Sequence, residues 1–196
     1  MRFLAALLAC TSACTGWSPQ SPQPSHKRTA VHATDAAWQD FWQDLAARPE
    51  IRDAWRRAPC VLKGIAPADA LTLEALTQAV DADPSTLDDA ARVAHGASQG
   101  WTNGALDDDA RPSRRLRASS SKASVLLNHG GVAFPSLLGG ACRAALDAFE
   151  QPVGLNVYLT GDRVAKAAPP HTDRQEVFVV QCAGAKRWCV FASASA

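Results

Sequence analysis

The sequence predicts an α+β domain, with helices in its N-terminal part and strands towards its C-terminal end. Two patterns support this prediction. Apolar residues recur at helical spacing between residues 34 and 45 and again between 135 and 150. Between residues 155 and 160, apolar and polar residues alternate strictly, which is typical of a strand with one buried face.

The composition fits one domain and directs attention to local sites. The chain has 196 residues, of which 47% are hydrophobic, enough for one core of ordinary size. Its 20 basic and 19 acidic residues leave a net charge of +1, so no global field favours nucleic acid or an acidic membrane. No apolar stretch reaches the roughly 18 residues of a membrane span. The six cysteines show no C-x-x-C spacing and indicate neither a zinc site nor a disulfide framework.

The N-terminal residues 1–33 have the pattern of a leader and a flexible linker. Arg2 precedes a short apolar run, Phe3–Ala9, and small residues follow up to Cys14, as in a minimal secretory or organelle-targeting leader. A frayed apolar N-terminus would explain the same run. Residues 15–33 hold three prolines among serines, glutamines and basic residues, which favours a linker. We therefore expect the folded domain over residues 34–196.

Five helices or strands are predicted before the C-terminal region. Thr34 or Asp35 can cap a helix whose Trp38, Phe41, Trp42 and Leu45 lie on one face, and we assign that face to the core. The other predicted elements are a strand over Pro59–Gly64, a helix over Thr72–Val80, a short strand over Val125–Leu127 and a helix over Pro135–Glu150.

Residues 81–124 show no clear periodicity and are predicted to be irregular. An acidic run, Asp107–Asp109, is followed by arginines at positions 111, 114, 115 and 117. Because opposite charges adjoin and no aromatic residues are interleaved, a solvated loop is favoured over a nucleic-acid site. Trp101 lies in this region and is either a core residue anchored in a turn or part of a substrate groove.

Residues that could bind a metal ion follow the alternating strand. Asn156 and Tyr158 point together from its polar side, which suits a lined cavity, and a loop then leads to His171-Thr172-Asp173. In a strand, His171 and Asp173 project to the same side. With a second histidine they would complete the 2-His-1-carboxylate face that binds Fe(II). A single His-x-Asp also arises easily by chance, and the alternative is a surface histidine near an aspartate.

A lysine in the next predicted hairpin adds an anion-binding group. Val177–Val180 has the composition of a buried strand, Ala183–Ala185 of a turn, and Lys186–Phe191 of the start of another strand. A lysine near a metal can pair with a carboxylate of a dicarboxylic cosubstrate. Alternatively, Lys186 is an ordinary charge at the end of a hairpin.

Four linked motifs resemble a known family. They are N-V-Y-L-T (156–160), P-P-H-T-D (169–173), E-V-F-V-V-Q (176–181) and G-A-K-R-W (184–188). In the JmjC-type cupins, which include the ribosomal oxygenases, the corresponding block reads N-x-Y-x-T, P-P-H-x-D, D-V-F-x-x-Q and G-x-K-x-W. The resemblance has its core over residues 153–191 and makes the chain similar to an Fe(II)/2-oxoglutarate-dependent protein hydroxylase.

The resemblance implies a fold, cofactors and residue roles. The fold would be a partial double-stranded β-helix, a cupin or jelly roll, with a helical N-terminal region. His171 and Asp173 would bind Fe(II), Lys186 would hold the distal carboxylate of 2-oxoglutarate, and Tyr158 and Asn156 would line its pocket. The implied partner is a protein substrate, ribosomal or histone-like. The family suggests the nucleus or cytoplasm, whereas a leader over residues 1–14 would suggest an organelle or the secretory route.

The sequence also departs from the family pattern. Thr172 stands where the family usually has an aromatic residue, and no histidine follows His171, although the second metal histidine of the family lies on a later strand. His129 is the only plausible substitute. We therefore expect a domain that is incomplete at its C-terminal end, a fragment of an oxygenase that is inactive alone. The alternative is a catalytically inactive cupin-like binding module without the third ligand.

Overall fold

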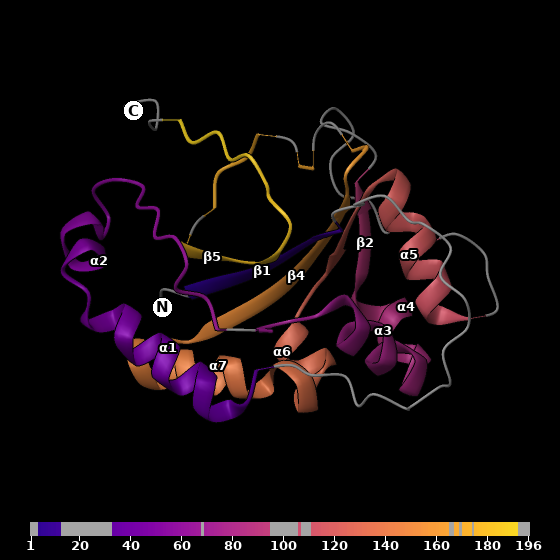
Figure 1. Cartoon of the computed structure of the whole chain (residues 1–196), viewed down its shortest axis with the longest axis horizontal. Helices are drawn as coiled ribbons and strands as arrows, with labels where there is room; N and C mark the ends of the chain where they lie inside the picture. Colours follow the sequence, from indigo (N-terminus) through magenta and orange to yellow (C-terminus); the bar gives the residue numbers. More distant parts are fainter. Residues whose placement is uncertain are drawn as a thin grey trace, which may run out of the picture.

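The chain forms a mixed five-stranded sheet with the strand order β2-β3-β4-β1-β5. The computed structural model describes residues 4–12, 33–67, 69–94, 106, 111–164, 167–168, 170–173 and 175–191. Helices α1, α6 and α7 lie along one face of the sheet, and the C-terminal segment runs over the other face (Figure 1). Together with the antiparallel strands, this arrangement confirms the predicted α+β class.

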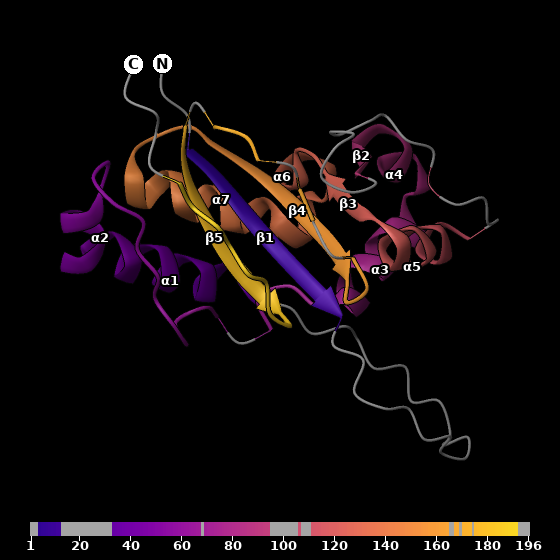
Figure 2. The ribbon, with the colours of Figure 1, turned by 90° about the horizontal axis from the view of Figure 1, so that it is seen from above.

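The sheet has a parallel half and an antiparallel half. Strand β1 (Leu4–Ser12) lies between β4 (Val153–Gly161) and β5 (Glu176–Ala183) and is parallel to both. Strands β2 (Ala91–Ala94), β3 (Ser124–Leu127) and β4 pair antiparallel, so that Ser124 lies opposite Thr160. Seen from above, β4, β1 and β5 run side by side across α7 (Figure 2). The predicted strand over Val125–Leu127 is confirmed.

An aromatic cluster joins the first helix to the sheet. Helix α1 (Asp35–Ala47) begins as predicted, because the Thr34 hydroxyl accepts a hydrogen bond from the amide of Ala37. Its predicted core residues are all buried. The Trp42 ring meets the Phe149 and Phe178 rings edge-on, at centroid distances of 6.1 and 5.7 Å. Helix α1 therefore packs against both α7 (Pro135–Phe149) and β5.

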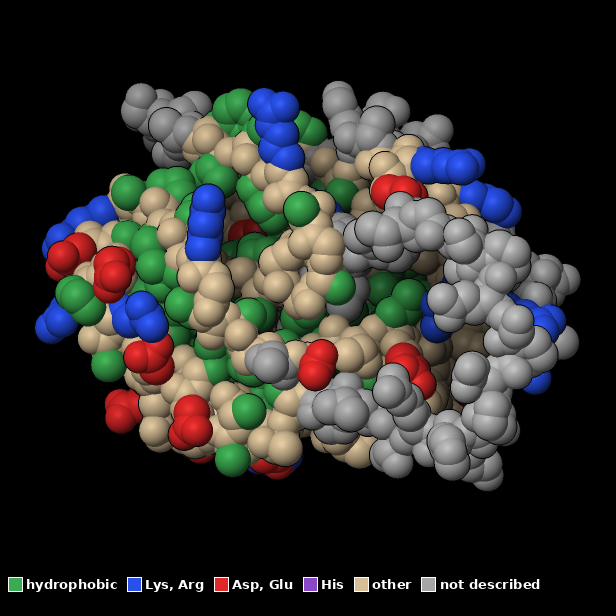
Figure 3. All heavy atoms as spheres, in the orientation of Figure 1, with side chains coloured by type: hydrophobic (Ala, Val, Ile, Leu, Met, Phe, Trp, Pro, Cys, Tyr) green, Lys and Arg blue, Asp and Glu red, His purple; other side chains and the backbone are tan. Residues whose placement is uncertain are grey.

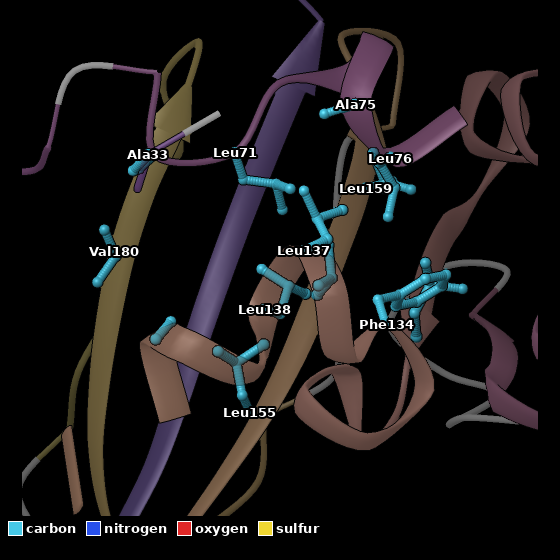
Figure 4. Close-up of a cluster of buried hydrophobic side chains, with 14 of the residues drawn as sticks. Ala33, Leu71, Ala75, Leu76, Phe134, Leu137, Leu138, Leu155, Leu159 and Val180 are labelled. Carbon is cyan, nitrogen blue, oxygen red and sulfur yellow. The ribbon is translucent and has the colours of Figure 1, made fainter. Parts of the chain in front are cut away.

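The apolar face of β4 lies in the same core. Leu155, Val157 and Leu159 are buried beneath α7 and the short helix α6 (Gly130–Ala133). In the close-up, Leu137 and Leu138 of α7 gather with Leu155 and Leu159 of β4 (Figure 4). Because side chains alternate along a strand, Asn156, Tyr158 and Thr160 project from the opposite face of the sheet.

The region predicted to be irregular contains three regular elements. Helix α3 (Leu73–Ala82) agrees with the prediction, but α4 (Pro84–Ala90), β2 and α5 (Pro112–Lys122) replace most of the loop expected over residues 81–124. Within α5, Leu116 is the apolar residue of a buried face whose other members are Ser113 and Ser119. That face has little hydrophobic periodicity. The prediction of a loop was therefore wrong for residues 112–122, although Arg114 and Arg117 are exposed to solvent as expected.

Two predicted strands are absent and a third is less buried than expected. Residues 59–64, which follow α2 (Pro49–Ala54), form no strand: Val61 is 80% exposed and Gly64 has a positive φ of 71°. Residues 186–191 also form no strand, and Val190 and Phe191 are 66% and 75% exposed. The run Val177–Val180 lies in β5, but only Val180 is buried, because β5 is at an edge of the sheet.

The N-terminal segment enters the sheet as β1. Residues 4–12 lie within the predicted leader, and their backbone pairs with β4 and β5. Removal of residues 1–14 as a leader stays a prediction. Residues 15–32, Trp101 and Asp107–Asp109 lie outside the described residues. None of the helices that the structure describes combines the length and apolar character needed to cross a bilayer.

Candidate metal and cosubstrate site

The site lies on the face of the sheet opposite α1 and α7. Strand β4 supplies Asn156, Tyr158 and Thr160 because their apolar neighbours on the strand are held in the core. The segment after β5 crosses this face and brings Lys186 over it (Figure 1). The turn that leads out of β5 uses Gly184, whose positive φ of 65° suits glycine.

Lys186 is a half-buried cation that contacts three uncharged side chains. Its Nζ donates a hydrogen bond to Thr160 Oγ1 at 3.2 Å and lies 5.7 and 5.9 Å from the ring centroids of Tyr158 and Trp188. Burial lowers the pKa of the Lys186 ammonium. Among the residues that the structure describes, no carboxylate forms an ion pair with it. An anionic ligand would therefore be stabilised at this position.

Thr160 is a site residue to which the sequence analysis assigned no role. It is buried, and its Oγ1 lies 2.7 Å from the hydroxyl of Ser124 on the neighbouring strand. Its position as the last polar residue of the alternating strand is the signal that could have identified it. Ser124 gives no comparable signal, because only the sheet register brings it opposite Thr160.

Tyr158 connects Lys186 with the predicted metal ligands. Burial, and after it the negative charge of Asp173, raises the pKa of Tyr158 to about 12. The phenol is therefore protonated at neutral pH and can donate a hydrogen bond to an anion. The effect of Asp173 also means that this carboxylate lies close enough to Tyr158 to act on its charge.

His171 and Asp173 converge, although no strand carries them. They lie in a segment without regular structure, so the prediction of a strand at this position was wrong. Their side chains nevertheless meet: Nε2 of His171 is 3.8 Å from Oδ2 of Asp173, and the side chains are 47% and 44% exposed. Metal bonds to imidazole and carboxylate are about 2.1 Å long. Adjacent ligands of an octahedral ion with such bonds lie about 3.0 Å apart, so the two side chains converge but would have to approach further to bind one Fe(II).

The described residues supply no third ligand. No group of three His, Cys, Asp or Glu side chains suited to a metal occurs among them. His129, the predicted substitute, has a left-handed backbone at the start of α6, and its backbone N–H donates to Asn156 Oδ1 at 3.1 Å. Asn156 thus contacts the β3–α6 turn. Its role in lining a pocket stays a prediction, as do the roles of the other predicted site residues.

Comparison with known families identifies the segment that carries the site. The family model described as JmjC domain matches residues 141–196. This match supports a JmjC-type cupin over the segment. It contains the predicted site residues and all four motifs, whereas Ser124 lies before it. No curated protein and no solved structure matches the chain. The resemblance to the ribosomal oxygenases within the family stays a prediction.

Proposed function

We propose that the JmjC segment, residues 141–196, is the cofactor-binding part of an Fe(II)/2-oxoglutarate-dependent protein hydroxylase. One observation carries the proposal: Lys186, a half-buried cation without a carboxylate partner among the described residues, shares Tyr158 as a neighbour with Asp173. The proposed anion-binding lysine and one of the proposed metal ligands thus share a neighbour. A dicarboxylic cosubstrate that also contacts the metal needs both.

The metal pair would be His171 and Asp173. When bound, iron and 2-oxoglutarate together supply the dioxygen-dependent oxidation that hydroxylates a C–H bond and converts 2-oxoglutarate to succinate and carbon dioxide. The chain's own contribution is to hold and orient these groups. Because both side chains are about half exposed, a substrate side chain can reach them from solvent.

The cosubstrate would be held by groups that donate hydrogen bonds. The ammonium of Lys186 and the hydroxyls of Thr160 and Tyr158 can all donate to a carboxylate, and a charge-assisted bond is the stronger kind. Trp188 lies beside the ammonium and excludes water from one side of it. Asn156 would line the same pocket from strand β4.

The proposed fold and substrate rest on the family match. We propose that the polar face of this sheet is the inner face of a cupin double-stranded β-helix. The proposed substrate is a protein side chain, ribosomal or histone-like, because the matched family is the JmjC domain family.

A second candidate function is a binding module without catalytic activity. The number of metal ligands favours this candidate, since the described residues add no third ligand to His171 and Asp173. Two ligands cannot fix the three-cornered face that an Fe(II) oxygenase uses. On this argument the isolated chain binds 2-oxoglutarate but does not turn it over.

The decisive experiment measures binding and turnover with the same purified chain. Isothermal titration with 2-oxoglutarate should show binding that Lys186→Ala weakens about 10-fold or more, the loss of a hydrogen-bonded charge. Lys63→Ala, which removes an exposed lysine, is the control. Equal binding by the wild type, Lys186→Ala and Lys63→Ala would contradict the proposed cosubstrate site. Fe(II)-dependent release of succinate, abolished by His171→Ala, would establish the hydroxylase and exclude the inactive module.

A further inference from the structure

A buried hydroxyl pair lies directly behind the proposed cosubstrate site. Ser124 is fully buried and Thr160 is 5% exposed, and their oxygens are 2.7 Å apart. The two residues are register partners on β3 and β4. The C-terminal end of α5 covers this corner, because a Cβ on Gly161 would lie only 2.7 Å from the carbonyl oxygen of Ser120. Helix α5 therefore contacts strand β4 at the residue next to Thr160, while the Thr160 hydroxyl contacts Lys186.

The chemistry of the three groups constrains their hydrogen bonds. The Thr160 hydroxyl has one proton to donate and two lone pairs to accept with. An ammonium only donates, so Thr160 accepts from Lys186. Either hydroxyl can be the donor between Ser124 and Thr160. If Ser124 donates, both lone pairs of Thr160 are used and its proton is directed to a third partner.

A carboxylate bound beside Lys186 would favour the arrangement in which Ser124 donates to Thr160. A carboxylate accepts hydrogen bonds only, and a bond to an ionised acceptor is stronger than one between two neutral hydroxyls. The lowest-energy arrangement then runs from Ser124 to Thr160 and from Thr160 to the carboxylate. Hydrogen bonds in such a chain polarise and strengthen one another.

We propose that Ser124 is a positioning residue for the carboxylate bound at Lys186, acting by donating to Thr160 so that Thr160 donates to the ligand. This inference rests on the proposed function, which supplies the carboxylate of 2-oxoglutarate. It extends the site beyond residues 141–196 to β3, a strand that none of the four motifs includes. The region before the JmjC segment thus takes part in ligand binding.

A double-mutant cycle on the full chain tests the proposal. The probes are 2-oxoglutarate and glutarate, which keeps both carboxylates and lacks the oxo group that a metal would bind. Binding is measured by NMR titration without added metal. Ser124→Ala should weaken binding of both probes about 10-fold, the loss of one hydrogen bond to a charged group. Thr160→Val should weaken binding at least as much.

The double variant separates positioning from a structural effect. If Ser124 acts through Thr160, adding Ser124→Ala to Thr160→Val causes no further loss, because the relay is already broken. An equal loss in both backgrounds, or no loss in either, would overturn the proposal. Ser113→Ala is the matched control, since Ser113 is also buried but bonds to Asp81 on α3.

Two further measurements distinguish a loss of folding, or a failure of the proposed function, from a failure of the positioning role of Ser124. Chemical denaturation shows whether Ser124→Ala folds; if it does not, Ser124→Cys keeps the size and a weak donor and should bind more weakly than the wild type. Lys186→Ala tests the proposed function separately. If the wild type binds neither probe, both proposals fail. If it binds through Lys186 but independently of Ser124, only the positioning role fails.

Discussion

Tyr158 is a neighbour of both parts of the proposed site, the lysine proposed to bind the cosubstrate and the proposed metal ligand Asp173. It neighbours the ammonium of Lys186, and its ionisation is opposed by burial and by Asp173. A protonated phenol beside a cation is consistent with a pocket that collects hydrogen-bond donors for an anion. Ionisation of Tyr158 would replace one of these donors with a negative charge and would oppose ligand binding.

The pKa of Tyr158 gives a direct test, because the chain contains a single tyrosine. Tyrosinate absorbance of the folded protein should rise with a midpoint near 12, against 10.0 for an ordinary tyrosine. Asp173→Asn should lower the midpoint without restoring the ordinary value, since burial is the larger cause. Asp162→Asn, a change at another aspartate, should leave it unchanged. A wild-type midpoint near 10 would contradict the buried phenol.

The same pKa predicts how stability changes at alkaline pH. Because the folded state holds the Tyr158 proton more tightly than the unfolded state, the unfolded state loses its proton first. The free energy of unfolding should therefore fall between about pH 10 and pH 12 from this group. Denaturant titrations at pH 9 and pH 11.5 measure the fall, which should be smaller in Tyr158→Phe. An identical fall in both proteins would assign it to other groups.

At the scale of elements, strand β4 and helix α5 are in close contact at Gly161. A Cβ at this position would meet the Ser120 carbonyl at 2.7 Å and the Ser121 Cα at 3.0 Å, and both are backbone atoms. Gly161→Ala should therefore push α5 away from β4 and destabilise the protein by roughly 1–3 kcal/mol. Because Thr160 is the preceding residue, binding of 2-oxoglutarate should weaken as well.

The same strand provides the control for this prediction. Nothing lies within 4 Å of a Cβ built on Gly154, near the other end of β4. Gly154→Ala should leave the free energy of unfolding unchanged or slightly higher, since alanine restricts the unfolded chain. Equal destabilisation by both substitutions, measured by denaturant titration, would show that the α5 contact is not the cause.

Elements with strong periodicity could be predicted from the sequence, and elements that depend on distant partners could not. The spacing of Trp38, Phe41 and Trp42 identified α1, and the alternation at 155–160 identified β4. Helix α5 escaped because serines occupy most of its buried face, and the Ser113 hydroxyl is satisfied by Asp81, 32 positions earlier. The Val61 run resembled a strand but pairs with none of the strands that the structure describes, and Val61 is exposed.

The residues of the candidate site also divide into those that the sequence predicted and those that it did not. The motifs located His171, Asp173, Tyr158 and Lys186, and the structure brings the first two together and the last two together. The contribution of Ser124 depends on the register of β3 against β4, and residues 36 positions apart in the chain give no local pattern. Ser124 is positioned by sheet register and therefore could not be found from the sequence, whereas Thr160, the last polar residue of the alternating strand, could have been.

At the scale of the whole molecule, the JmjC segment is joined to the rest of the chain by a common core. Helix α1 lies outside the matched residues, yet Trp42 packs against Phe149 and Phe178 within them. Part of the surface outside this core is also hydrophobic. Hydrophobic side chains reach solvent over β5 and the C-terminal segment (Figure 3), where Val179, Trp188, Val190 and Phe191 are exposed.

Trp42 tests whether the site depends on this common core. The side chain is 1% exposed, and truncating a buried tryptophan to alanine costs about 3–5 kcal/mol, a large share of the roughly 5–15 kcal/mol that stabilises a domain. Trp42→Ala should lower the melting temperature and abolish 2-oxoglutarate binding, although residue 42 lies on the opposite face of the sheet. Val132→Ala, at a side chain 82% exposed, should change neither. If Trp42→Ala melted early but bound normally at low temperature, the JmjC segment would hold its site without α1.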